Sequence, residues 1–176
     1  TEGRYNILIG SDAGNALTDG DHNTMIGINA GATADTSTTS AQYNVYIGNS
    51  TGRYLDDGVN NVAIGYEAMK SSGNTQNAGN NVAIGYQSLL AITDGDNNVA
   101  IGSYAGDAIT TGADNTLMGL SAGSGITTGG TNTAIGSYAL YAMTTNSGNT
   151  ALGYRAGQHT TGSDNVLIGY QSGRST

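Results

Sequence analysis

The chain has 176 residues, of which 29 are Gly, and it contains no Pro, Cys, Trp or Phe. Hydrophobic residues make up 37% of the chain and charged residues 10%, so large apolar side chains are too few for a thick central core and favour a thin, stacked coil. The net charge of −8 disfavours binding to nucleic acid or to an anionic membrane, which need basic stripes. No apolar run approaches the ~20 residues of a membrane span.

A five-residue signature recurs along the chain: Asn, then Thr, Val or Ile, an apolar residue, Ile (Met or Leu in two units) and Gly. Successive signature Asn residues are 17, 21, 17, 20, 17, 17, 17, 17 and 16 positions apart. Self-similarity at such a period predicts a solenoid. We therefore treat 1–176 as a single repeat domain, expected to be a fragment of a longer chain, whose units start near Asn6, Asn23, Asn44, Asn61, Asn81, Asn98, Asn115, Asn132, Asn149 and Asn165.

Each signature predicts a short β-strand. The segment Val-Ala-Ile is partly β-branched and lies between Asn and Gly, which is typical of a strand followed by a turn. Helices are disfavoured because each internal Gly costs about 1 kcal/mol relative to Ala. The predicted fold class is all-β, a parallel β-solenoid (β-roll or β-helix) of about ten coils of ~17 residues. At about 4.8 Å per coil the rod would be about 48 Å long.

Two invariant positions predict structural roles. In a parallel stack the Asn side chains lie above one another, where their amides hydrogen-bond along the column, and Asn tolerates a left-handed backbone at a corner. The signature Gly is expected to supply a positive φ or a place too crowded for a Cβ atom. A small residue three places after Gly and a second apolar column (Leu17, Leu55, Ile92, Ile109, Ile126 and Met143) complete the repeat.

The central residue of the strand is apolar in every unit, as are most of its neighbours. Since alternate strand residues point to opposite faces, one face is expected to fill the coil and the other to pack on a partner chain. A long exposed apolar stripe is rare in soluble monomers. The sequence therefore predicts a homo-oligomer, with three copies favoured, that associates through the central column of Ala63, Ala83, Ala100, Leu117, Ala134 and Ala151.

The units NTAIGSYAL (132–140) and NVAIGYQSL (81–89) resemble repeats of bacteriophage tail-fibre and receptor-binding proteins. The signature is also similar to the head repeats of trimeric autotransporter adhesins of the Yersinia adhesin type. The resemblance covers essentially the whole chain, although adhesin heads commonly repeat at a shorter spacing. It implies a left-handed, trimeric, extracellular β-roll built for attachment, and it carries over no functional residues.

Several features are candidates for ligand contact. Two longer units, within Gly31–Tyr43 and Lys70–Asn80, predict outward loops that are either decoration or contact sites. Tyr residues after the signature Gly either bind a glycan or cover a seam. Asp19–Asn23 and Asp94–Asn98 offer oxygen ligands but are expected to be turns. The Thr column Thr93, Thr110, Thr127, Thr144 and Thr161 leaves an ice-binding solenoid as an alternative.

We expect no enzyme activity and assign no catalytic, cofactor or metal residues; His22 and His159 are predicted to lie about eight coils apart. The function expected is a structural or attachment shaft of an extracellular fibre, foremost a viral tail fibre that presents or forms a receptor-binding surface. A bacterial surface adhesin head and a subunit of an extracellular filament are the alternatives besides ice binding. A cell-surface receptor or glycan would be the partner, with no nucleic acid and no membrane insertion.

Overall fold

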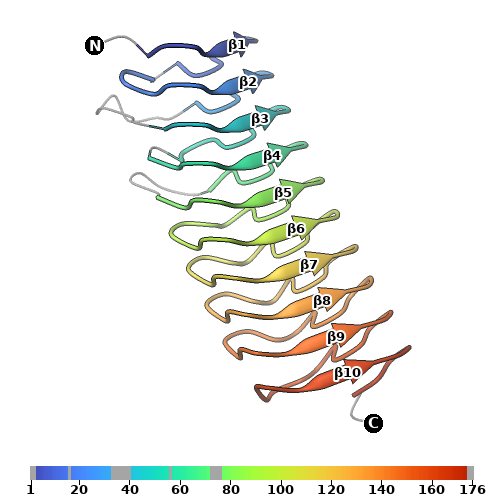
Figure 1. Cartoon of the computed structure of the whole chain (residues 1–176). Coiled ribbons are helices and arrows are strands. Elements are labelled where there is room, and N and C mark those ends of the chain that lie inside the picture. Colours follow the sequence, from blue (N-terminus) through green and yellow to red (C-terminus); the bar gives the residue numbers. More distant parts are fainter. Residues whose placement is uncertain (1–2, 16, 33–40, 56, 72–76, 174–176) are drawn as a thin grey trace.

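The computed structural model describes residues 3–15, 17–32, 41–55, 57–71 and 77–173. These residues form one all-β solenoid in which ten three-residue strands pair in chain order as a single parallel sheet (Figure 1). The strands are β1 (Ile7–Ile9), β2 (Thr24–Ile26), β3 (Val45–Ile47), β4 (Val62–Ile64), β5 (Val82–Ile84), β6 (Val99–Ile101), β7 (Thr116–Met118), β8 (Thr133–Ile135), β9 (Thr150–Leu152) and β10 (Val166–Ile168). The predicted fold class and coil spacing are confirmed.

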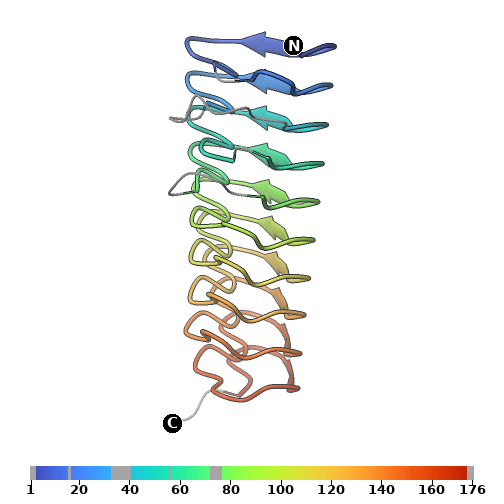
Figure 2. The ribbon, with the colours of Figure 1, turned by 90° about the vertical axis from the view of Figure 1, so that its left-hand side faces the viewer.

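The coils stack into a rod whose two ends carry the two termini (Figures 1 and 2). Equivalent residues of successive signatures are direct register partners, as in Ala63 opposite Ala83 and Ala83 opposite Ala100. Units of 20 residues keep the same register as units of 17, because the extra residues lie outside the strand. The two long units fall mainly on residues 33–40 and 72–76, outside the described part of the chain, so their predicted loops stay a prediction.

A buried asparagine ladder connects the coils. Asn98 accepts the backbone N–H of Asn115 with its Oδ1 atom (3.0 Å) and donates its Nδ2 group to the carbonyl of Gly112 in the next coil (2.9 Å). The amide of Asn115 also donates to Asn98 Oδ1 (3.0 Å), which confirms the predicted side-chain bonding along the column. The backbone N–H to Oδ1 bond recurs at every step from Asn6 to Asn165. Each coil is therefore fastened to the next by a side chain as well as by the backbone.

The signature Gly satisfies both predicted reasons for glycine. Gly102 has a φ of 140°, and a Cβ atom there would lie 2.4 Å from the carbonyl oxygen of Gly119. The left-handed corner, however, does not lie at the signature Asn. It lies at the residue before it, as in Asn60, Asn80 and Asn97 with φ values of 57°, 59° and 59°. The signature Asn itself uses its side chain for the ladder, so the preceding residue makes the corner.

The central column of the strands lies inside the coil. Ala63, Ala83, Ala100, Leu117, Ala134 and Ala151 each have 0% exposure within the single chain. The prediction that a partner chain packs on this column is wrong, because the strand turns its central side chain into the narrow coil interior. The first and third strand residues point outward instead. The second apolar column is also interior, with Leu55, Ile92, Ile109, Ile126 and Met143 buried.

The interior is filled by a size match between two positions of each coil: the central strand residue and the residue four places after the signature Gly. A large central residue faces Gly, as in the pair Tyr46 and Gly52, whose added Cβ would lie 2.5 Å from the Tyr46 ring. A central Ala faces a large residue, as in Ala63 with Met69. Where both residues are small, as in Ala100 with Gly106, side chains of the neighbouring coils fill the space. Leu89 and Leu117 both approach Gly106. The interior is therefore a thin, continuous core that runs along the rod, with side chains of neighbouring coils in contact.

We predict that Asn98→Ala lowers the free energy of unfolding by roughly 2–5 kcal/mol, since buried donors and acceptors left without partners cost about 1–3 kcal/mol each. Chemical denaturation followed by circular dichroism measures the loss. The control is Asn97→Gly, at an exposed neighbour whose positive φ suits Gly; it should change stability by only about 0.5 kcal/mol. Equal losses in both variants would contradict the structural role of the ladder.

The size match predicts that Ala63→Leu destabilises the chain by about 1–3 kcal/mol through overpacking. Adding Met69→Gly vacates the facing position and relieves a residue held at φ 51°. The double variant should therefore recover most of the loss. Denaturation of both single variants and of the double variant gives the coupling energy. Simple additivity of the two single changes would show that these positions do not share space.

Candidate functional site

The outer sheet face is a repeated, mostly apolar surface that follows the rod. We define it as the first and third residues of the ten strands, which are Val, Thr, Ile, Met or Leu. They are half-buried in the middle coils, for example Val99 and Ile101, and exposed toward the ends, where Val166 and Ile168 are 71% and 64% exposed. These side chains stand on one parallel sheet that follows the length of the rod (Figure 2).

Apolar residues directly after the signature Gly lie beside this face. They are exposed large side chains: Ile28, Tyr66, Tyr86, Leu120, Tyr154 and Tyr170. Tyr66 and Tyr86 stack with their ring centroids 5.4 Å apart and an interplanar angle of 11°, and Tyr154 and Tyr170 stack in the same way at 5.5 Å. Stacked rings turn their faces toward each other and offer edges and hydroxyls to solvent. This favours the seam-covering role of Tyr over a flat platform for sugar rings.

A second aromatic column lies before the first three signatures. The ring of His22 stacks between Tyr5 and Tyr43, with centroid distances of 4.9 and 5.1 Å. All three residues have positive φ, so the backbone holds these side chains directly above one another. His159 lies near the other end of the rod, after β9. The structure therefore keeps His22 and His159 apart, as predicted.

The Asp-Gly-Asp segments serve the coil turns. The carboxylate of Asp21 accepts the backbone N–H of Arg4 (2.5 Å), and that of Asp96 accepts the N–H of Gly79 (2.7 Å). Each therefore ties a turn to the preceding coil. Within the described residues no group of three or more His, Cys, Asp or Glu side chains is placed to hold a metal ion.

The Thr column is also engaged within the rod. The hydroxyl of Thr93 donates to the carbonyl of Thr110 (3.0 Å), Thr110 donates to Thr127 (3.2 Å), and Thr127 donates to Thr144 (3.3 Å). A hydroxyl committed to the next coil is not free to order water into an ice-like array. This bonding weakens the ice-binding alternative for that column.

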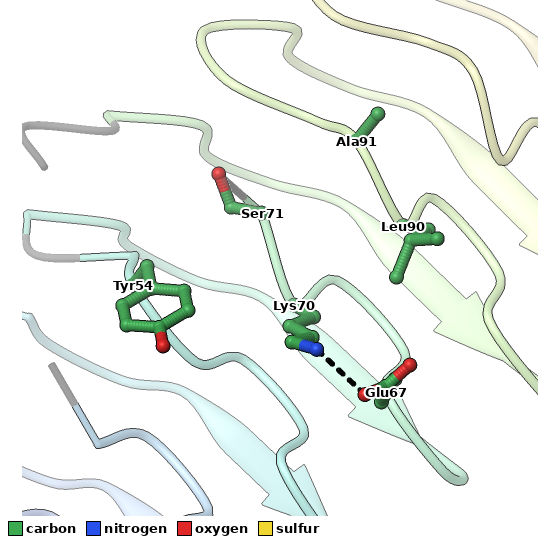
Figure 3. A pocket seen from close by; sticks show the side chains of 6 residues that line it. All are labelled: Tyr54, Glu67, Lys70, Ser71, Leu90 and Ala91. Atoms are coloured by element: carbon green, nitrogen blue, oxygen red, sulfur yellow. Dashed lines mark hydrogen bonds and ion pairs between the residues drawn. The ribbon is translucent and has the colours of Figure 1, made fainter. Parts of the chain in front are cut away.

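A surface hollow of about 450 Å³ lies at the start of the second long unit, between Tyr54, Glu67, Lys70, Ser71, Leu90 and Ala91 (Figure 3). Lys70 Nζ donates to Glu67 Oε1 at 2.6 Å, and Gln87 donates to Glu67 Oε2 at 2.7 Å. The hydrogen bond from Lys70 lowers the pKa of Glu67, so the carboxylate stays charged, and both of its oxygens are already hydrogen-bonded to these two side chains. The hollow thus offers an aromatic ring and an apolar wall beside an internally satisfied ion pair.

The two ends of the rod differ from its middle. At the first coil Ile7, Leu8 and Ile9 are 53%, 44% and 57% exposed, although the equivalent central residues of β2 to β9 are buried. At the last coil a hollow of about 390 Å³ opens beside Asn165, Leu167 and His159. The central residue of β1 is therefore less covered by the described residues than the central residues of β2 to β9.

No family model, curated protein or solved structure matches the chain. The described part of the chain contains no helix long and apolar enough to cross a bilayer.

Tyr46 is a fully buried ionisable side chain in the coil interior, and burial raises its pKa above the ordinary value of about 10. The folded state keeps the phenol protonated while the unfolded chain ionises, so folding stability falls as the pH rises above about 10. We predict that Tyr46→Phe reduces this alkaline loss without lowering stability at neutral pH. Denaturation at about pH 8 and pH 11 measures the difference. An equal alkaline loss in the wild-type chain and in Tyr46→Phe would contradict this origin of the pH dependence.

Proposed function

We propose that this chain is a structural shaft segment of an extracellular attachment fibre, foremost a viral tail fibre. The observation that supports it is the buried asparagine ladder, which fastens every coil to the next from Asn6 to Asn165. A side chain that bonds forward at each step, together with parallel backbone pairing, resists bending and separation of the coils. In the described residues, the recurring Asn, Thr and Asp side chains form hydrogen bonds between coils.

The same proposal includes side-by-side association of copies through the outer sheet face. One column of Ile, Met and Leu and one column of Val, Thr and Ile follow the rod, and the exposed Ile, Leu and Tyr side chains after the signature Gly widen this surface. Strands about 10 Å long over about 45 Å of rod give roughly 450 Å² of face, which is about half of the ~800 Å² per partner of a standard interface. The widening side chains therefore belong to the interface, and three copies would surround a common axis.

An antibody against the 176-residue chain tests the fibre role by electron microscopy of virus particles and cells from the source sample. Label along fibres on virions supports the tail-fibre shaft, and label on cell surfaces supports the bacterial adhesin head. Label confined to a fibre tip would indicate a receptor-binding end instead of a shaft. Particles and cells that carry no labelled fibre would contradict the proposal.

We predict that Ile101→Lys, on the outer sheet face, reduces the mass of the assembly to that of fewer chains and leaves the circular dichroism spectrum unchanged. The reason is that a charge would enter an apolar contact between copies. Thr111→Lys, at an exposed turn, is the matched control and should retain the assembly. Light scattering measures the mass. Ala100→Asp should unfold the rod, because its side chain lies inside the coil.

An Ile101→Lys variant whose mass equals that of the Thr111→Lys control would contradict association through this face. The spectrum of each variant decides whether a mass change reflects a lost contact or lost folding.

A further inference from the structure

Arg155 places a positive charge in a column of the repeat that is otherwise neutral or acidic. The second residue after each signature Gly forms this column, and all of its members have a positive φ. The column consists of Asp12, Asn29, Ser50, Glu67, Gln87, Tyr104, Ser121, Tyr138, Arg155 and Gln171. Between Asn115 and Gly173 the other residue among Asp, Glu, Lys and Arg is Asp164, which lies at the corner before β10. The side of the rod after β8 and β9 is therefore locally free of acidic residues.

The guanidinium group of Arg155 lies in a corner between two tyrosine rings. Its Cζ atom is 5.0 Å from the ring centroid of Tyr154 and 5.6 Å from that of Tyr138 in the preceding coil. The two rings are nearly perpendicular, with an interplanar angle of 89°. Tyr154 in turn stacks on Tyr170 of the following coil. Contact with two aromatic rings stabilises the cation and restricts the conformations of its side chain.

This corner lies within the stack. The N–H of Arg155 donates to the carbonyl of Ser137 in the preceding coil (2.9 Å). In the following coil the N–H of Gln171 donates to the carbonyl of Tyr154 (2.9 Å). The coils of β8, β9 and β10, all described, therefore hold the guanidinium in place.

The N–H donors of Arg155 lack acceptors. Its Nε atom is buried without a hydrogen-bond partner, and among the described residues the ion pair that forms joins Lys70 to Glu67 and leaves Arg155 out. The side chain is partly exposed, so its Nη groups are accessible from outside. A guanidinium carries all its N–H donors in one plane. Because the tyrosine rings contact its faces, the edge of the plane remains available for an acceptor.

We propose that Arg155, held by Tyr138 and Tyr154, binds the carboxylate of a small acidic ligand. A planar carboxylate matches the fork of a guanidinium and accepts two parallel hydrogen bonds from it. The edges of aromatic rings carry positive partial charge and phenol hydroxyls donate, so the surrounding tyrosines also favour an anion. Their role is to hold the cation, and no sugar ring has to stack on them. The site goes beyond the proposed shaft role and does not depend on it.

Titration of the full 176-residue chain with sodium acetate, followed by nuclear magnetic resonance, tests the site. The Arg155 Nε–H signal and the amide signals of Tyr154 and Arg155 should shift and saturate with acetate. Sodium chloride at the same ionic strength should leave these signals unsaturated. The comparison separates carboxylate binding from screening of the charge.

Three variants assign the binding to the guanidinium fork. Arg155→Gln should weaken acetate binding at least about tenfold, because it removes hydrogen bonds from a charged donor. Arg155→Lys retains the charge without the planar fork, so its affinity should lie between those of Arg155→Gln and the wild-type chain. Arg53→Gln is the matched control: Arg53 also lies over a tyrosine ring, that of Tyr54 at 4.6 Å, and also has a buried Nε atom without a partner. This control should bind acetate at Arg155 with wild-type affinity.

Circular dichroism of each variant establishes that the fold is retained. Acetate binding that persists in Arg155→Gln, or chloride that produces the same saturating shifts, would overturn the inference. A lower assembly mass of Arg155→Gln by light scattering would also overturn it, because the guanidinium would then serve a contact between copies. Labelling of fibres does not bear on these outcomes, so the shaft proposal and the carboxylate site succeed or fail separately.

Discussion

The amide of one asparagine in each coil is the interaction on which the rest of the fold depends. Its Oδ1 atom receives the backbone N–H of the next signature Asn, and its Nδ2 group donates to a carbonyl of the next turn, so one side chain satisfies polar groups of two coils. Inside a coil with so little apolar volume, an unpaired buried amide would be costly. Because the amide is satisfied only if the next Asn lies directly above it, the ladder fixes the register. The three-residue strands, too short to specify register alone, then pair in line.

Register in turn dictates where glycine is required. The signature Gly residues lie directly above one another, and an added Cβ on Gly102 would meet the carbonyl oxygen of Gly119 at 2.4 Å. At Gly169, where no coil follows in the described residues, an added Cβ would meet nothing within 4 Å, although its φ is also positive. The comparison separates two demands: the backbone conformation belongs to each coil, whereas the exclusion of a side chain arises only from stacking. The glycine column is thus a consequence of the close approach that the asparagine ladder enforces.

Periodicity predicted the coil length, the parallel strands and the asparagine bonding, because all of these repeat with the sequence. It did not predict which face of the strand points inward. Both faces of Val-Ala-Ile are apolar, and the alternation of side chains along a strand does not by itself tell which face is interior. The signal that decides it was present elsewhere in the unit. The large Tyr46 occurs with Gly52, and the small Ala63 occurs with the large Met69. A large residue at one position combined with a small residue at the other is expected only where the two side chains share one interior. Side chains on the outer face, such as Val99, are only half-buried and do not share that interior.

Uniform repetition also explains why the candidate surface is the outer face. Repetition places Val or Thr and Ile, Met or Leu on the outer face of nearly every coil, and a long face results that no single coil could generate. Function in such a molecule arises from surfaces that extend along the stack, whereas an enclosed site would need residues that differ from coil to coil. The departures from the repeat near Glu67 and Lys70 are one place where the described chain provides such differences, and there the charged groups are already bonded to each other and to Gln87.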